Sequence, residues 1–423
     1  MFRILVVLSL LLWSCGATGQ KAPATAQFGV ISDCHFDPFL YPDQTILALA
    51  NTPDVSKWKR ILLNGRRPQV NYGSDSDLIL IQAALQSLHH SFETQPPLFI
   101  LAAGDFLGHN FENKCNEHRL NYPSFALRTE EFVASLFADE FSDCPVFPTL
   151  GNNDTDNGHN KPPKTNSTFL REVALAWSRL VWPNNDKEAA DFVSHFSQDG
   201  WYECDSNATK RPIHLFVLNS SLMTGETNDR YVDYCDQLSW VSNRVSAMSE
   251  PKAWLLFHIP PGIDSFAFLR DTNHPINLWN LDRQREFLAW LGPSAKIAEI
   301  VCGHTHRDEF RALFRGSKAD RLIRIAPSIG PNTSNNPAFK IYSVTAAGDI
   351  VECQTFFSTD FKTFVAEYQQ SDVSIKAIYP PNASSETKQN FARYYGAQSR
   401  PGNRLIQQHR DNYWNVVLHL DIP

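Results

Sequence analysis

Short hydrophobic runs recur along the chain, and each ends abruptly in polar residues. The runs are QFGVIS (27–32), PLFILAAG (97–104), PVFPTLG (145–151), IHLFVLNS (213–220), AWLLFHIP (253–260) and AEIVCGH (298–304). Continuous apolar runs of this length are typical of strands that are buried on both faces. The pattern therefore predicts an internal sheet, with polar residues gathered where its strands end.

Longer stretches with helical spacing lie between several of these runs, for example 77–92 and 124–141. Alternation of buried strands and helices predicts an α/β fold, in which functional residues gather beyond the carboxyl ends of the strands. Further strands are expected at 321–330 and 339–357. The second is expected to form a hairpin that turns near Ala347, Gly348 and Asp349.

The rest of the chain carries weaker patterns. Residues 41–75 are rich in Pro, Asn and Asp and are expected to form a long loop. From Ser358 onward the pattern becomes polar and helical, without a motif. We therefore expect a main domain over residues 20–357 and a mainly helical C-terminal extension, 358–423, packed on it.

Composition and charge narrow the class of protein. The chain has 423 residues, of which 43% are hydrophobic and 20% charged, and this excludes a disordered or collagen-like protein. The formal net charge is −7, and the basic stretch KWKRILLNGRR (57–67) is short. A nucleic-acid binder held by phosphate contacts is therefore not expected. The basic stretch could meet an anionic substrate, although such runs are more often solvated faces.

The first residues, MFRILVVLSLLLWSCGATGQ, place one arginine before an apolar run from Ile4 to Trp13. The run is too short to span a bilayer and predicts a signal peptide over residues 1–19, hence secretion or another extracytoplasmic location. A lipoprotein signal with Cys15 as the lipid-bearing residue is the alternative. No later segment is expected to cross a membrane. Asn-x-Ser/Thr triplets, relevant only to a eukaryotic secretory route, begin at Asn153, Asn166, Asn207, Asn219, Asn332 and Asn382.

Export permits disulfides, and seven cysteines remain after Cys15. An odd count leaves at least one free thiol. The expected pairs are Cys115–Cys144 and Cys204–Cys235. The other three cysteines lie in hydrophobic or motif segments and are expected to be free.

The predicted strand ends carry His, Asp and Asn residues. They are Asp33 and His35, then Asp105 with His109 four residues on, then Asn152, Asn153 and Asp154, then His258, and finally His304 and His306. An isolated histidine at a strand end is usually structural, but five such ends in one chain are difficult to attribute to chance. In a strand, residues two apart point the same way, so each Asp-x-His or His-x-His pair could converge on one place.

Imidazole and carboxylate are the usual ligands of Zn, Fe or Mn, and an amide oxygen is an acceptable weaker ligand. If seven of these ten side chains are ligands, they are too many for one tetrahedral ion but suit two ions that share a bridging carboxylate. Two divalent ions carry a charge of +4, and the carboxylates of Asp33 and Asp105 contribute only −2. The site would stay positive, which favours an anionic substrate such as a phosphate ester.

The series DCH, GDFLGH, GNND, a histidine after a strand, and GHTH resembles the calcineurin-like metallophosphoesterase superfamily over residues 27–345. The wider spellings ISDCHFDP, GDFLGH, HIPPG and GHTHRDEF resemble its acid sphingomyelinase-like phosphodiesterases, which are extracellular or lysosomal. The resemblance implies a β-sandwich flanked by helices and a phosphodiesterase that cleaves P–O bonds with a metal-bound hydroxide. No cysteine-rich saposin-like segment precedes Asp33, so a soluble phosphodiester, nucleotide or polyphosphate is expected rather than sphingomyelin.

The resemblance also assigns roles to residues. It implies Asp33, His35 and His306 as ligands of a first ion, Asn152, His258 and His304 as ligands of a second, and Asp105 as the bridge. Zinc is the expected metal, with iron and manganese as alternatives. His109 matches the histidine near the phosphate in this group and is expected to stabilise the transition state or to protonate the leaving oxygen.

Asn153 stands where the superfamily usually has a histidine that faces the leaving group. An amide can donate a hydrogen bond to a phosphoryl oxygen but cannot deliver a proton. Either His109 acts alone, or His159 replaces the missing histidine, or the leaving group needs little protonation. The last case fits an endopolyphosphatase, whose Gly-Asn-Asn-Asp spelling is similar, or a nucleotide pyrophosphatase. A non-catalytic binding protein on the same fold is a minor alternative.

Overall fold

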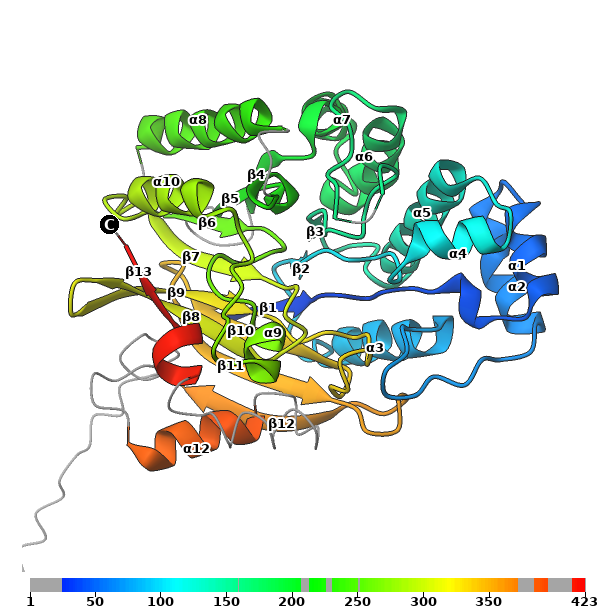
Figure 1. Cartoon of the computed structure of the whole chain (residues 1–423). Coiled ribbons are helices and arrows are strands. Elements are labelled where there is room, and N and C mark those ends of the chain that lie inside the picture. Colours follow the sequence, from blue (N-terminus) through cyan, green and yellow to red (C-terminus); the bar gives the residue numbers. More distant parts are fainter. Residues whose placement is uncertain are drawn as a thin grey trace, which may run out of the picture.

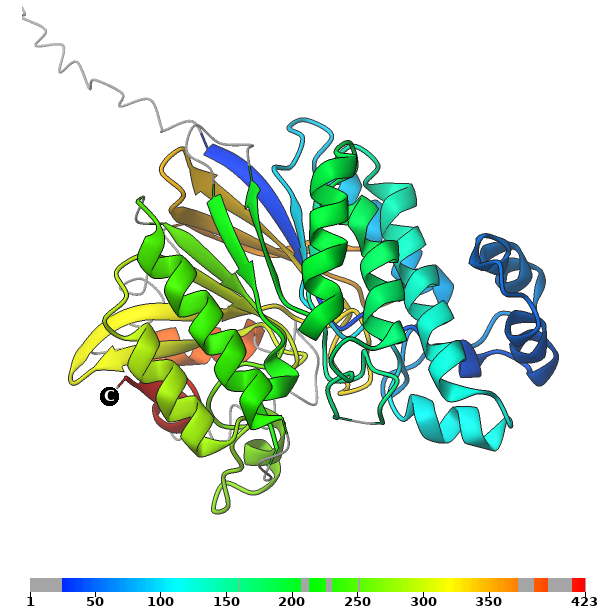
Figure 2. The same cartoon turned by 90° about the horizontal axis from the view of Figure 1, so that it is seen from above.

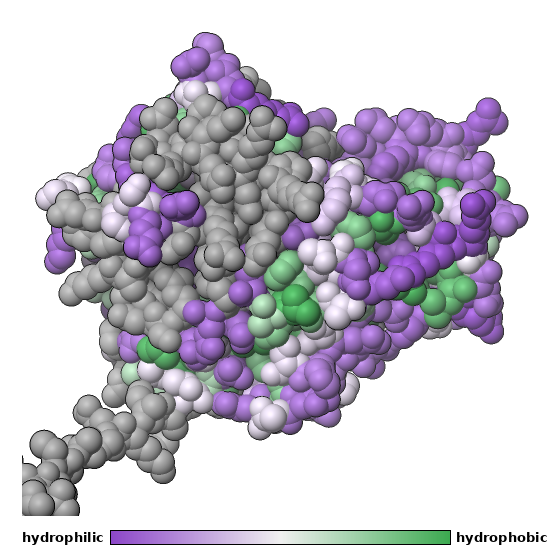
Figure 3. Space-filling model, turned by 90° about the horizontal axis from the view of Figure 1, so that it is seen from below, coloured by the Kyte–Doolittle hydropathy of each residue, from purple (hydrophilic) through white to green (hydrophobic). Residues whose placement is uncertain are grey.

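The computed structural model of the chain describes residues 25–158, 160–206, 213–225, 230–249, 252–371, 384–394 and 413–422. The predicted signal peptide, Cys15 and His159 lie outside these residues. Within them, no helix combines the length and the hydrophobicity that a bilayer crossing requires. Seen from below, hydrophilic side chains cover most of the visible described surface, and hydrophobic ones form small patches (Figure 3).

Two sheets form the centre of the molecule, with helices on their outer sides (Figures 1 and 2). The six-stranded sheet has the order β12 (Val365–Ser371), β11 (Ile350–Phe357), β10 (Ala338–Thr345), β1 (Thr25–Ile31), β2 (Ile100–Ala102) and β3 (Val146–Pro148). The seven-stranded sheet has the order β13 (His419–Asp421), β8 (Glu309–Arg315), β9 (Lys318–Ile325), β7 (Ile297–Cys302), β6 (Ala253–Leu256), β5 (Ile213–Val217) and β4 (Tyr202–Ser206). The predicted α/β sandwich flanked by helices is confirmed.

The helices cover both sheets. They are α1 (Asp43–Ala50), α2 (Trp58–Asn64), α3 (Leu78–His90), α4 (Phe111–Glu117), α5 (Tyr122–Glu140), α6 (Thr168–Val181), α7 (Asp186–Asp199), α8 (Tyr231–Ala247), α9 (Ser265–Arg270), α10 (Leu281–Leu291) and α12 (Ser385–Tyr394). Helices α3 and α6 contact β10 and β3 of the six-stranded sheet. Helices α8 and α10 supply residues to a separate core with the seven-stranded sheet.

Strand alternation explains why the seven-stranded sheet is hydrophobic on both faces. Along β6, Trp254 and Leu256 belong to the core that also holds Phe28 of β1, whereas Leu255 belongs to the core under α8 and α10. Neighbouring residues of a strand point to opposite faces, so a sheet covered on both sides needs continuous apolar runs. This is the pattern by which the strands were predicted.

Residues 41–75 differ from the predicted long loop, because they contain the short helices α1 and α2 (Figure 1). Ile46 and Leu49 of α1 and Trp58 and Leu62 of α2 are buried at helical spacing. The prediction of a loop was therefore wrong for this segment. The basic stretch 57–67 spans α2, which lies at the far end of the molecule from the seven-stranded sheet in both views (Figures 1 and 2).

The predicted hairpin is confirmed: β10 and β11 pair antiparallel, and Gly348 takes a positive φ of 80° in the turn. The described part of the C-terminal extension differs from a mainly helical segment. Besides α12 it contains β12, which pairs with β11, and β13, which pairs with β8. Each of these strands covers what would otherwise be an open sheet edge.

All seven described cysteines are free, so both predicted disulfides are wrong. Cys115 precedes α5 and Cys144 follows it. A helix of 19 residues is about 28 Å long, which separates the two thiols. Cys204 belongs to the core shared with the six-stranded sheet, whereas Cys235 packs against the core under α8 and α10.

Candidate metal centre

The predicted site residues follow the carboxyl ends of five strands. Asp33 and His35 come after β1, Asp105 after β2 and Asn152 after β3, while His258 follows β6 and His304 and His306 follow β7. Strands β1, β2 and β3 are parallel in one sheet, and β6 is parallel to β7 in the other. The carboxyl ends from both sheets therefore meet at one place, and the seven predicted ligands are brought together there.

The backbone of these loops is unusual. Asp33, His35, Asp105, His304 and His306 have φ values between 43° and 74°, in the left-handed region. Such values are uncommon for residues with a side chain and concentrate at functional sites. The two-residue spacing was expected to work through strand alternation, but these residues lie beyond the strands. Alternate left-handed residues, rather than a pleat, aim the side chains inward.

Two glycines allow the loops to approach one another. A Cβ added at Gly303 would meet Ser32 Oγ at 1.9 Å, and one at Gly151 would meet Asp105 Oδ1 at 2.1 Å. No side chain fits in either place. Glycine therefore precedes Asn152 and His304 because the loops pack closely there, as much as because glycine has a freer backbone.

Among the described residues, the possible ligands form three overlapping groups, and the two groups that contain six of the seven predicted ligands share one member. Asp33, His35, Asp105 and His306 offer ligand atoms within 4.8 Å of one another, and so do Asp105, His258 and His304. Asn152 adds its Oδ1 to the second group, 3.1 Å from His258 Nε2. Asp105 is the residue common to both.

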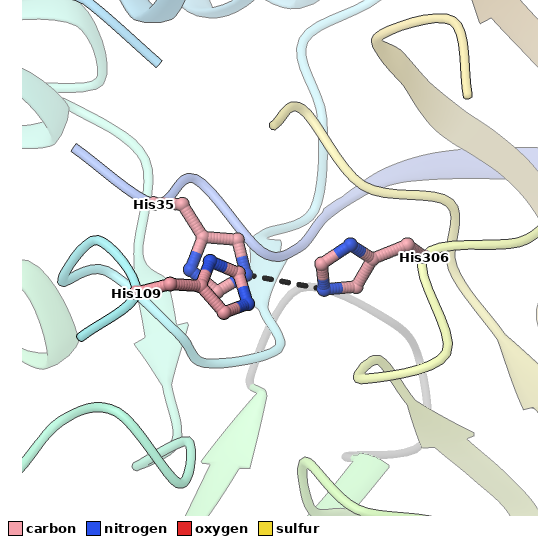
Figure 4. A group of neighbouring side chains, drawn as sticks. All are labelled: His35, His109 and His306. Carbon is pink, nitrogen blue, oxygen red and sulfur yellow. Dashed lines mark hydrogen bonds between the residues drawn. The ribbon is translucent and has the colours of Figure 1, made fainter. Parts of the chain in front are cut away.

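Distances between ligand atoms are short on each side of Asp105. His35 Nε2 lies 3.1 Å from His306 Nε2, which lies 3.2 Å from Asp33 Oδ1 (Figure 4). On the other side, His258 Nε2 lies 3.2 Å from Asp105 Oδ2. Lone pairs that converge at such distances are arranged as they would be around a cation.

The hydrogen bonding of Asp33 by itself indicates that this site holds a cation. Asp33 Oδ1 is buried and accepts no hydrogen bond among the described residues. A buried carboxylate oxygen without a donor is costly unless a cation balances it. Burial disfavours the charged form of both carboxylates, but the neighbouring histidines hold the pKa of Asp33 and of Asp105 below the usual range. Both residues are therefore ionised at neutral pH, as metal ligands must be.

Backbone carbonyls orient two of the histidines. His35 Nδ1 lies 2.9 Å from Leu107 O, and His258 Nδ1 lies 2.7 Å from Ala103 O. A proton on Nδ1 donated to a carbonyl leaves Nε2 as the lone-pair nitrogen that faces the centre. The loops thus fix both the direction and the tautomer of these side chains.

Asn153 contacts the shared carboxylate rather than an open space. Its backbone N–H donates to Asp105 Oδ1 and its side-chain amide donates to Asp105 Oδ2, each at 2.8 Å. The expected contact was with a phosphoryl oxygen. In the structure Asn153 instead holds both oxygens of Asp105 in place.

Asp154, whose role the sequence left open, holds the two central loops together. Its carboxylate accepts backbone N–H groups of Asp105, Phe106, Leu107 and Gly151 at 2.7–3.1 Å. Glu130 of α5 lies beside it, fully buried, and burial together with Asp154 raises the pKa of Glu130 well above its usual range. Burial and the neighbouring Asp154 thus favour the neutral form of the Glu130 carboxyl group. Nothing in the sequence pattern distinguishes Glu130 from other acids of its helix.

His109 forms the third group with His35 and His306, whose ligand atoms all lie within 4.8 Å of one another (Figure 4). Its ring centroid is 4.0 Å from that of His35. Asp75 accepts from the backbone N–H of His109 and lies 2.7 Å from its Nδ1, which fixes the ring. Asn332 Nδ2 lies 3.0 Å from both ring nitrogens. The sequence marked Asn332 only as a glycosylation triplet and gave no signal for Asp75.

A cavity of about 550 Å³ adjoins His109. Its described walls include Asp37, Phe39, Asp75, Lys114, Glu117, His118 and Asn332. Lys114 Nζ lies 2.6 Å from Asp37 and 3.5 Å from Asp75, so the one lysine of these walls is shared between two acids. The cavity offers room for one side of a substrate next to His109.

The profile of the calcineurin-like phosphoesterase family matches residues 26–308. A sphingomyelinase phosphodiesterase C of Dictyostelium discoideum is 24% identical over 75% of this chain and 69% of its own length. A cyclic GMP-AMP phosphodiesterase of Mus musculus is 24% identical over 79% and 73%. An endopolyphosphatase of Schizosaccharomyces pombe is 26% identical over 56% and 42%. Among solved structures, a dimetal phosphatase from Danio rerio is 12% identical, with a TM-score of 0.44 over 82% of this chain and 99% of that one.

Proposed function

The chain belongs to the calcineurin-like phosphoesterase family and is a metal-dependent phosphodiesterase, and we propose that it binds two divalent ions and hydrolyses phosphodiesters outside the cytoplasm. The observation that carries the proposal is the shared ligand Asp105. It belongs both to the group with Asp33, His35 and His306 and to the group with His258 and His304. Export rests on the signal-like residues 1–19.

Nitrogen and oxygen donors of this kind suit zinc, with iron or manganese as alternatives. Asp33, His35 and His306 would hold one ion, Asn152, His258 and His304 the other, and Asp105 both. When bound, two such ions supply Lewis acidity and an activated water for an in-line displacement at phosphorus. Two ions bring +4 against −2 from Asp33 and Asp105. The remaining positive charge favours an anionic phosphate substrate.

His109 would donate the proton that the leaving oxygen needs. Asp75 holds the ring through Nδ1, so Nε2, which lies 3.0 Å from Asn332 Nδ2, is the nitrogen that would meet the leaving oxygen. Asn153 would act on Asp105 rather than on the leaving group, because its amide and backbone N–H are both engaged there. The chain therefore needs only one histidine as acid, and Asn153 keeps the bridging carboxylate in one orientation.

The cavity beside His109 favours a diester over a polyphosphate. Its described walls hold three carboxylates, of Asp37, Asp75 and Glu117, against the charge of Lys114. A leaving group that carries further phosphates would meet repulsion there. An uncharged alcohol would not.

A phosphoanhydride substrate is the second candidate. Two observations favour it. One is the Gly-Asn-Asn-Asp motif, and the other is that the Asn153 amide donates to Asp105, so that among the described residues of this loop none stands at that position as a proton donor. A phosphate leaving group needs little protonation. The substrate could then be a polyphosphate or a nucleotide.

A phosphorus NMR time course on metal-loaded protein separates the candidates. One tube would hold detergent-solubilised sphingomyelin, glycerophosphocholine, ATP and polyphosphate, with Asp105→Asn as the control. We expect diester signals to fall first and no signal to change with the variant. Earlier loss of anhydride signals would favour the second candidate, and hydrolysis by Asp105→Asn at the wild-type rate would refute the shared-ligand site.

A further inference from the structure

A second cavity is lined by residues of α7, α8 and the edge strand β4 and lies apart from the metal centre. Figure 1 shows where these three elements lie. Its volume is about 480 Å³, which is enough for a small organic molecule. None of the metal-centre residues lines it. The cavity has no part in the mechanism proposed above and is independent of it.

Tryptophans form much of its wall. Trp182, Trp201 and Trp240 all line the cavity and are only partly buried. The rings of Trp201 and Trp240 lie 6.4 Å apart at 40° to each other. Three partly accessible indoles in one cavity present aromatic surface that a bound ligand would cover.

Carboxylates complete the wall. The described lining includes Glu188, Asp191, Asp199, Glu203 and Asp236, and it includes no lysine or arginine. Arg244 and His214 pair with Glu203, and Arg230 lies 3.8 Å from Asp199. For the other three acids, no ion pair is present among the described residues. A concave wall with this excess of negative charge concentrates cations.

We propose that this cavity binds a small organic ammonium cation, held over the indole faces and balanced by the surrounding carboxylates. Indole is the aromatic ring that binds cations best, and aromatic cages of this kind recognise alkylated ammonium groups. An apolar ligand would gain nothing from the carboxylates, and an inorganic ion would gain little from the indoles. The combination of the two selects an alkylated ammonium.

Choline and its uncharged isostere 3,3-dimethylbutan-1-ol test the charge requirement directly. Calorimetric titration of the metal-loaded full chain at constant ionic strength would measure both affinities. We expect choline to bind about ten times more tightly, since a desolvated cation–aromatic contact contributes about that factor. Equal affinities would overturn the proposal, and so would binding of N-acetylglucosamine in preference to choline, which would mark a sugar site.

Matched variants locate the binding. Asp236→Asn removes one unpaired wall charge, and Trp240→Leu removes one indole, whereas Asp143→Asn removes an exposed acid elsewhere. We expect the first two to weaken choline binding about fivefold or more. Asp143→Asn should change nothing, and hydrolysis by Asp236→Asn should match the wild type. Retained choline affinity in folded Asp236→Asn and Trp240→Leu proteins, checked by circular dichroism, would contradict this location.

Discussion

At the scale of single residues, His109, the proposed proton donor, is held by Asp75, an acid that lies 34 positions earlier in the chain. One carboxylate oxygen of Asp75 accepts a hydrogen bond from the backbone N–H of His109, and the other lies 2.7 Å from Nδ1 of its ring. Burial and the neighbouring His35 lower the pKa of His109 to about 4, although Asp75 acts in the opposite direction. His109 is therefore neutral at pH 7, and its donor form is populated in acid.

This pKa predicts how activity depends on pH. The protonated form of His109 is lost as pH rises above its pKa, so kcat/KM for an alkyl phosphodiester should fall as pH rises above about 4. His109→Ala should reduce that rate about 100-fold or more. A nitrophenyl diester needs little protonation and should show neither effect. Asp75→Asn should move the alkyl-ester limb to lower pH, because it removes a charge that raises the pKa.

The nitrophenyl ester also controls for loss of metal in acid. Hydrolysis of either ester needs the same metal ligands, so a loss of metal would slow both. Profiles of kcat/KM from pH 4 to 8 for the two esters would be compared in wild type and variants. If His109→Ala slows both esters equally, His109 is not a proton donor.

At the scale of elements, the edge strand β4 is tied to β5 by a charged cluster. Asp205 pairs with His214 across the two strands, and His214 also lies 2.9 Å from Glu203. Burial alone would lower the pKa of His214, but hydrogen bonds to Asp205 and Glu203 raise it to about 9. The ordinary value in an unfolded chain is about 6.5. The charged histidine thus contributes its full stabilisation of the folded state below about pH 6.5, and this stabilisation is lost as pH rises through about 9.

Replacing His214 should therefore change stability in a pH-dependent way. His214→Gln should lower the free energy of unfolding by about 1 kcal/mol at pH 6 and by much less at pH 10. Urea unfolding at the two pH values measures this. His274→Gln is the control, because His274 is exposed and, among the described residues, its ion pair is with Asp271 of the same loop. A loss of equal size at both pH values would rule out the charged cluster as its cause.

Elements that were predicted well are those whose signal is local. The apolar runs correspond to strands of the two sheets, and Gly348 marks the predicted turn. Helices α1 and α2 were missed because they have only eight and seven residues, and Pro and Asn between them obscure the spacing of Ile46, Leu49 and Trp58. Strands β12 and β13 were missed because they pair with edges that are distant in sequence.

At the scale of the whole molecule, the metal centre lies where two sheets meet. Three loops come from the six-stranded sheet and two from the seven-stranded one. The seven ligands could be predicted because each lies in a motif at a strand end, and the structure brings them together. Asp75, Glu130 and Asn332 could not be predicted, since they reach the site from a loop, a helix and another loop that carry no recognisable motif.

The most direct test of a two-ion phosphodiesterase is a titration of metal-free protein with zinc, which follows hydrolysis of a nitrophenyl diester and the thermal midpoint together. We expect activity to reach its maximum at two equivalents of zinc per chain and the midpoint to rise, because ligands from both sheets bind the ions. Asp105→Asn should remain inactive and bind zinc more weakly. Full activity at one equivalent, or activity without metal, would contradict the account.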